Sequence, residues 1–320
     1  MELPSLTELE AAAELVHSVI PPTPQICWPL LSARVGAELW VKHENHTQAG
    51  AFKLRGGLVY LDDLKRAQPG IAGVITATTG NHGQSIAWAA SRLGLKAVIV
   101  VPHGNSPEKN RAMVGFGATL VEHGHDFQAA YEHAMAIAER ENLYPVRSFH
   151  PLLMRGVASY GLELFRAVPD LDVVYVPIGL GSGICGVIAA REALGCKAEI
   201  VGVVAENAPA YALSFAAGKP VSTNSADTFA GGIAVRVPDP AAVDVVCRHA
   251  ARIVQVSEDE MKAATRIIFS DTHNVAEGAG AAPLAAALQE RDRLKGKKVA
   301  VIQSGGNIDR PLFAEILAAE

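Results

Sequence analysis

The chain has 320 residues, of which 49% are hydrophobic and 19% charged, and its formal net charge at pH 7 is -5. This length suffices for one large or two mid-sized domains, and the high apolar content excludes a disordered chain. The acidic balance, without any basic block, argues against nucleic acid or an anionic membrane as a partner.

Three further features of the sequence point to a cytoplasmic protein. Residues 1–8 are acidic and lack the apolar centre of a signal peptide. No apolar run in the sequence approaches the roughly 18 residues needed to span a bilayer. The four cysteines show no CxxC spacing, which favours free thiols in a reducing compartment.

Short apolar runs alternate with segments of helical periodicity along most of the chain. Two helices are marked by Ser106-Pro107 and by the capping box of Ser257 and Glu260. Uniformly apolar strands separated by helices predict parallel sheets covered on both faces, in two α/β lobes with a ligand site in the crevice between them. Strands are predicted at 74–77, 97–101, 173–176, 200–204, 253–256 and 299–302, and a further helix at 85–93.

One lysine stands among unusually small neighbours. Lys53 follows Phe52 and lies between Gly50-Ala51 and Gly56-Gly57. A tight, partly dry pocket lowers the pKa of a lysine, and such an amine can form a Schiff base with a carbonyl, including that of pyridoxal phosphate (PLP). The alternative is a solvated lysine at the start of an amphipathic helix, and this segment alone does not separate the two.

The loop at residues 78–84 joins a predicted strand to a predicted helix. It contains Thr78, Thr79, Gly80, Asn81 and His82. Hydroxyls and backbone N–H groups at a helix N-terminus form an anion site, which suits a substrate carboxylate. An ordinary helix cap without a ligand is the alternative.

A second loop, residues 179–183, reads Gly179-Leu180-Gly181-Ser182-Gly183. Three glycines and a serine between a strand and a helix form a nest of N–H groups suited to phosphate. The same glycines with Gly186 also spell GxGxxG, and Glu206 ends the next strand, so a dinucleotide site is the rival interpretation.

The third loop, residues 303–307, ends the last predicted strand. Its two glycines permit a flat ring to approach the backbone, and Ser304 offers a hydroxyl to a ring nitrogen. Glu277 stands among small residues and faces either a crevice or solvent. His123 and His125 are two residues apart in a predicted surface loop, and we expect no metal site.

Together these segments resemble the threonine dehydratase and serine racemase group of fold-type II (tryptophan synthase β-like) PLP enzymes. The match runs from about residue 20 to the end, with four motifs in order. The resemblance implies a large PLP-binding domain, residues 1–45 and 148–320, with a parallel sheet. It also implies a smaller, mobile α/β domain at 46–147, no C-terminal regulatory domain, and a homodimer.

The resemblance also implies roles for single residues. Lys53 is expected to bind PLP and to act as the base, and Thr79 stands where racemases carry a serine that serves as the opposite-face base. The substrate carboxylate is expected at Thr78, Thr79, Gly80, Asn81 and His82. Further cofactor contacts are expected from Phe52, Asn81, Gly179, Leu180, Gly181, Ser182, Gly183, Glu277 and Ser304.

The implied activity is a PLP-dependent dehydratase, an ammonia-lyase of amino-acid catabolism, that converts a small L-3-hydroxy amino acid of the threonine or serine type into a 2-oxo acid and ammonia. A bulkier or acidic analogue, 3-phenylserine or 3-hydroxyaspartate, is an open alternative, as is serine racemase. Relatives carry a divalent-metal loop that begins at a glutamate matching Glu206, but its second acid is replaced near Ala212. More distant alternatives are an NAD-dependent oxidoreductase and a non-catalytic amino-acid-binding protein.

Overall fold

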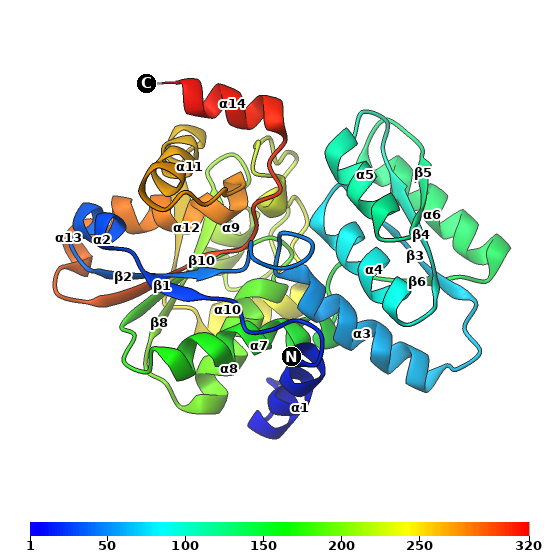
Figure 1. Cartoon of the computed structure of the whole chain (residues 1–320), viewed down its shortest axis with the longest axis horizontal. Coiled ribbons are helices and arrows are strands. Elements are labelled where there is room, and N and C mark those ends of the chain that lie inside the picture. The colour runs from blue at the N-terminus through cyan, green and yellow to red at the C-terminus, as the bar shows by residue number, and fades with distance from the viewer. Residues whose placement is uncertain (320) are drawn as a thin grey trace. The chain divides into compact units, whose positions relative to one another are not determined.

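Two sheets of mainly parallel strands organise the chain, which a computed structural model describes over residues 1–319. The chain divides into two compact units, Met1–Phe52 with Val157–Glu320 and Lys53–Gly156. Figure 1 shows their helices and strands. The domain bounds implied by the sequence, 45/46 and 147/148, stay a prediction. The boundaries between the two compact units lie at 52/53 and 156/157, seven and nine residues later along the chain.

The larger unit, Met1–Phe52 with Val157–Glu320, is built on a six-stranded sheet in the order β1-β2-β10-β7-β8-β9. All its neighbouring strands are parallel except β1, which runs antiparallel to β2 at the edge. Its central strands are apolar almost throughout because helices cover both faces. The strands are β1 (Gln25–Cys27), β2 (Glu38–His43), β7 (Val173–Pro177), β8 (Glu199–Ala205), β9 (Arg252–Val256) and β10 (Lys298–Gln303).

Helices of the larger unit pack on both faces of this sheet. α12 packs on β7, β8, β9 and β10, and α8 packs on β7 and β8. Figure 1 shows α11 and α12 on one side of the strands and α8 on the other. The helices are α1 (Leu6–His17), α2 (Pro29–Val35), α7 (Pro151–Ala167, which crosses the unit boundary), α8 (Ser182–Leu194), α9 (Ala210–Ala217), η1 (Gly231–Ile233), α10 (Pro240–His249), α11 (Glu258–Thr272), α12 (Gly278–Gln289), α13 (Arg291–Leu294) and α14 (Arg310–Ala318).

The smaller unit, Lys53–Gly156, has a four-stranded parallel sheet in the order β5-β4-β3-β6. Its core combines apolar residues of β3 and β4 with the inner face of α6. On another side of the unit, α3 packs along α4. The elements are α3 (Lys53–Ala67), β3 (Gly73–Ala77), α4 (Asn81–Arg92), β4 (Lys96–Val101), α5 (Pro107–Gly115), β5 (Thr119–Glu122), α6 (Phe127–Glu141) and β6 (Tyr144–Pro145).

The predicted strands and caps are confirmed, with small shifts at their ends. All six predicted strands are present, and the capping box of Ser257 and Glu260 closes the first turn of α11. The helix predicted at 85–93 begins earlier, at Asn81, because the polar loop residues already form its first turn. The strands missed from the sequence are β1, β2, β5 and β6, which are short or end in charged residues.

The carboxyl ends of three strands carry the three loops singled out from the sequence. Residues 78–80 follow β3, residues 178–181 follow β7, and residues 304–307 follow β10. Parallel strands place such loops at one edge of each sheet, where ligands of α/β proteins bind. Among residues 1–319, no helix is both long enough and apolar enough to cross a membrane.

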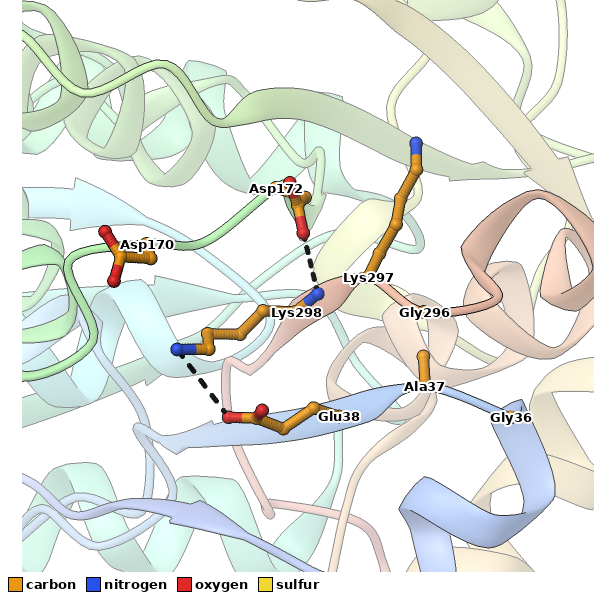
Figure 2. Close-up of a pocket in the computed structure, with 8 residues that line it drawn as sticks. All are labelled: Gly36, Ala37, Glu38, Asp170, Asp172, Gly296, Lys297 and Lys298. Carbon is orange, nitrogen blue, oxygen red and sulfur yellow. Dashed lines mark hydrogen bonds and ion pairs between the residues drawn. The ribbon is translucent and has the colours of Figure 1, made fainter.

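An open hollow of about 540 Å³ lies at the opposite edge of the larger sheet, where β2 and β10 begin. Figure 2 shows its lining, in which Lys298 Nζ lies 3.9 Å from Glu38 and the Lys298 backbone N–H donates to Asp172 at 2.8 Å. This hollow contains none of the expected site residues, and its place at the amino ends of the strands separates it from the expected ligand loops. Its lining residues are Gly36, Ala37, Glu38, Asp170, Asp172, Gly296, Lys297 and Lys298.

A buried ion network supports β2 in the larger unit. Lys42 Nζ donates to Glu163 at 2.5 Å and lies 4.0 Å from Glu44, and the Lys42 and Glu44 side chains are fully buried. Glu163 also contacts the His17 imidazole at 2.7 Å. The network therefore joins β2 and the residue after it to α7 and to the last residue of α1. Pairing offsets the cost of removing these charges from water.

We predict that Lys42→Met destabilises the larger unit by about 3–5 kcal/mol, because the carboxylates of Glu163 and Glu44 lose their buried cation. The free energy of urea unfolding, followed by circular dichroism, measures this. The control is Lys298→Met, which removes a more exposed and longer ion pair and is expected to cost below about 1 kcal/mol. Equal losses in the two variants would contradict this account of the network.

Candidate active site

Lys53 is the first residue of α3 in the smaller unit. Its backbone carbonyl accepts a hydrogen bond of 2.6 Å from the Ser85 hydroxyl of α4. Its charge also reaches the imidazole of His82, where it acts to lower the pKa. The smaller unit therefore brings the lysine singled out from the sequence near the start of α4, the helix that follows residues 78–80.

Hydrogen bonds within the loop before α4 order the start of this helix. The carbonyl of Gly80 accepts from the N–H groups of Gly83 and Gln84, and the Gly80 N–H donates to the Thr78 hydroxyl at 3.2 Å. The first N–H groups of an α-helix have no partner within the helix, so they favour an anion at this position. Thr78 is buried, whereas Thr79 is exposed at the tip of the loop.

His82 is buried in the first turn of α4, and its Nε2 atom has no hydrogen-bond partner among the described residues. Burial lowers the pKa of His82 to about 3, with a smaller contribution from the charge of Lys53. The imidazole is therefore neutral at physiological pH, and one of its nitrogens faces a buried position without a protein partner. Such an atom is costly unless a ligand or water satisfies it.

The glycine-rich loop of the larger unit ends at the N-terminus of α8. Gly181 has a φ of +108°, a backbone conformation that favours glycine, and α8 begins at Ser182. The Phe52 ring lies close to Gly183, 3.6 Å from the point where a Cβ atom on Gly183 would stand. The Tyr160 hydroxyl donates to the Gly183 carbonyl at 3.2 Å, and the Phe52 and Tyr160 rings meet edge to face at 6.0 Å.

The segment before Lys53 is hydrogen-bonded to the loop after β10. The Phe52 N–H donates to the Ser304 carbonyl at 3.1 Å, and the Gly306 N–H donates to the Gly50 carbonyl at 2.9 Å. The Asn307 side chain donates to the carbonyl of Ala49 at 2.7 Å. Residues 49–52 and 304–307, which are far apart in sequence, are thus joined by several hydrogen bonds. Ser304, in the second of these segments, is buried.

Glu277 is the N-cap residue of α12 and lies against this loop. Its backbone N–H donates to the Gly305 carbonyl at 3.2 Å. Its Oε1 atom lies 2.7 Å from the position of a Cβ atom on Gly305 and 3.7 Å from that on Gly232. The carboxylate therefore occupies space that side chains at these glycines would fill, so it lies beside the loop of Ser304.

Each unit thus gathers part of the expected residues. The larger unit brings together Phe52, Gly183, Glu277 and the loop of Ser304, and the smaller unit brings Lys53 near His82. Ser85 and Tyr160, whose hydroxyls donate to backbone carbonyls, were not expected from the sequence. No pattern in the sequence marks Ser85 or Tyr160, whereas Gly232 belongs to a run of small residues, Ala230-Gly231-Gly232.

The other sequence candidates lie elsewhere. Glu206, the acid of the dinucleotide interpretation, is exposed after β8. His123 stacks on His133 with ring centroids 3.7 Å apart. Within residues 1–319, no group of three or more histidines, cysteines or acids has a geometry that suits a metal ion.

Comparisons with known proteins identify relatives along almost the whole chain. The profile of the family described as "Pyridoxal-phosphate dependent enzyme" matches residues 16–305. The L-threonine ammonia-lyase of Thermotoga maritima is 34% identical over 317 residues, which cover 98% of this chain and 78% of that protein.

Solved structures also resemble this chain along almost its whole length. The processed form of threonine deaminase isoform 2 from Solanum lycopersicum superposes with a TM-score of 0.91 at 29% identity, covering 100% of this chain and 98% of that one. Maize serine racemase superposes with a TM-score of 0.92 at 26% identity, covering 98% and 97%. The two-domain α/β fold of fold-type II PLP enzymes, expected from the sequence, is confirmed.

We predict that the neutral state of His82 makes stability depend on pH. Between pH 6.5 and about 3 the unfolded chain protonates this imidazole and the folded chain does not, so stability falls as the pH is lowered through this window. His82→Gln should reduce the loss of unfolding free energy between pH 7 and pH 5 by on the order of 1 kcal/mol.

The control is His125→Gln, which removes an exposed imidazole of the same unit. Burial also lowers the pKa of His43, to about 4, so part of the acid sensitivity should persist in both variants. An unchanged pH dependence in His82→Gln would show that the imidazole is not buried in its neutral form.

Proposed function

The chain belongs to the family of pyridoxal-phosphate dependent enzymes, and on this premise we propose that it is an ammonia-lyase. Its proposed substrate is an L-3-hydroxy amino acid of the threonine or serine type, which it converts into a 2-oxo acid and ammonia. The observation that carries the proposal is Lys53, an amine at the start of α3. It stands in a chain of which 98% aligns with an L-threonine ammonia-lyase.

The larger unit offers groups that suit PLP. α8 begins at Ser182, directly after Gly181, and the first N–H groups of a helix suit a phosphate. The Phe52 ring lies close to Gly183, the residue after Ser182, and the Phe52 N–H donates to the carbonyl of Ser304 in the loop after β10. We propose that these residues hold the phosphate and the ring, and that Lys53, the next residue after Phe52, holds the aldehyde carbon.

PLP, when bound, supplies the electron sink that acidifies the α-hydrogen of the substrate. We propose that Lys53 Nζ, as the neutral amine, takes this proton. The N–H groups at the start of α4 and the Asn81 side chain bind the substrate carboxylate, which orients the α-hydrogen. Loss of the β-hydroxyl together with the proton taken by Lys53, as one water, would give an enamine, and hydrolysis of its imine tautomer by a second water would give the 2-oxo acid and ammonia.

Two residues favour elimination over other PLP reactions. Ser304 offers a neutral hydroxyl to the ring nitrogen, and a neutral partner damps the electron sink and disfavours transamination. Thr79, where racemases of the group carry a serine, retains a hydroxyl but adds a methyl group and a stiffer side chain. Loss of the β-hydroxyl is therefore the proposed main outcome, and return of a proton on the opposite face a minor one.

We predict 2-oxo acid release from L-threonine or L-serine by the PLP-loaded protein. L-threo-3-phenylserine and L-threo-3-hydroxyaspartate complete the panel, and chiral chromatography of the same reactions detects racemisation. Lys53→Ala should lower the rate by about 10²–10⁴-fold, because the general base is lost. The matched control is Lys65→Ala, which removes a lysine from the other end of α3. Binding of PLP without 2-oxo acid from any of the four substrates would contradict the proposal.

We predict that Gly181→Ala weakens PLP binding at least tenfold, because the new side chain meets a φ of +108° within the proposed phosphate loop. Equilibrium dialysis with PLP measures this. Gly195→Ala is the control, since Gly195 also has a positive φ, +65°, but stands at the other end of α8. Equal affinities in the two variants would place the phosphate elsewhere.

A further inference from the structure

We infer that Ser85 is a positioning residue that holds the backbone of Lys53 in place for the proposed reaction. The Ser85 hydroxyl donates a hydrogen bond of 2.6 Å to the carbonyl of Lys53. Ser85 has no solvent exposure, so water does not compete for this bond. The inference rests on the proposed function, in which Lys53 carries the reacting amine.

The bond exists because α3 and α4 approach closely at a glycine. A Cβ atom on Gly57 would overlap the Ser85 hydroxyl and stand 3.1 Å from the Ser85 carbonyl oxygen. Gly57 lies one helical turn after Lys53, on the same face of α3. The absence of a side chain at Gly57 thus leaves the space that the Ser85 hydroxyl occupies beside the Lys53 carbonyl.

The Lys53 carbonyl has two lone pairs, and the two helices use both. Within α3, the carbonyl of residue 53 is the acceptor for the N–H of residue 57, since helical bonds join residues four apart. The second lone pair accepts from Ser85, one turn into α4. A single hydroxyl therefore connects the start of α3 to the helix whose N-terminus is proposed to bind the substrate carboxylate.

This connection bears on the reaction through distance. The proton acceptor, Lys53 Nζ, is carried on a flexible stem of four carbons, so the place of its Cα atom decides which positions the amine reaches. Proton transfer requires the amine within hydrogen-bond reach of the α-hydrogen, and a displacement of about 1 Å can cost on the order of a hundredfold in rate. Fixing the backbone at residue 53 keeps the amine and the carboxylate site in register.

The test compares Ser85→Ala with Ser91→Ala, which alters an exposed serine of the same helix. We expect Ser85→Ala to lower kcat about tenfold with KM changed by less than about twofold, since the carboxylate loop is left intact. The visible circular dichroism of bound PLP, which reports how the cofactor is held on Lys53, should also weaken in this variant. Ser91→Ala should match the wild type in both measurements.

A double-mutant cycle distinguishes positioning from a general loss of stability. Gly57→Ala displaces the same hydroxyl from the other side, so its effect and that of Ser85→Ala should not add when the two are combined. A kcat and a PLP dichroism of Ser85→Ala equal to those of the wild type would overturn the inference. Additive losses in the double variant, or a lower thermal midpoint without a change in dichroism, would overturn it too.

Failure of the proposed function is distinguishable from failure of this inference. The dichroism of bound PLP needs no turnover, so it tests Ser85 even if none of the four amino acids is a substrate. If Lys53→Ala retains the visible dichroism of the wild type, Lys53 does not hold PLP, and the proposed function and this inference both fail. If that dichroism disappears in Lys53→Ala and weakens in Ser85→Ala, the inference stands whatever the substrate.

Discussion

The hydrogen bonds between residues 49–52 and residues 304–307 are the interaction on which the proposed site depends. They connect the end of the first sixth of the chain to the loop after the last strand, through the Phe52 N–H and the Ser304 carbonyl and through the Gly306 N–H and the Gly50 carbonyl. Loop closure over this separation costs entropy, which the surrounding buried sheet offsets. As a result, Phe52, the residue before Lys53, is held next to Ser304 at the carboxyl ends of the central strands.

Lys53 is consequently constrained on both sides along the chain. The residue before it is anchored within the larger unit by Ser304, and its own carbonyl is anchored within the smaller unit by Ser85. A change of compact unit falls between these two anchors, at the peptide bond from Phe52 to Lys53. Each anchor acts within its own unit, one on the backbone of Phe52 and the other on the carbonyl of Lys53, the residue proposed to bind the cofactor and to move a proton.

Glycines make these contacts possible, and they do so for reasons of volume more often than of backbone conformation. Gly305 leaves room for the Glu277 carboxylate, and Gly57 leaves room for the Ser85 hydroxyl. Among the glycines in the loops of the proposed site, Gly50 and Gly181 are the two that have a positive φ. Substitution at the first pair would displace a polar neighbour, whereas substitution at the second pair would strain the backbone itself.

The sequence predicted the parts of this arrangement that local patterns encode. Continuous apolar runs such as 173–176 and 299–302 mark buried parallel strands, and the glycine-rich loop at 179–183 marks a strand-to-helix turn. Local patterns do not identify a partner distant in the chain, so the hydroxyl of Ser85 and that of Tyr160 carry no signal, since each bonds a backbone carbonyl more than 20 residues away. The GxGxxG reading also shows that one loop fits two ligands, and the family comparison removed that ambiguity.

The electrostatic surroundings of Lys53 depend on the burial of His82. An imidazolium at His82 would oppose an ammonium at Lys53, and burial prevents this by holding the imidazole neutral. The smaller unit thus adds no positive charge from His82 near the lysine, and the lysine amine can gain a proton without repulsion from that side. The Nε2 atom of His82, which has no hydrogen-bond partner within residues 1–319, can accept or donate one hydrogen bond to a ligand or water. A neutral, partly unsatisfied group beside the proposed base is consistent with proton transfer in which Lys53 alone changes charge.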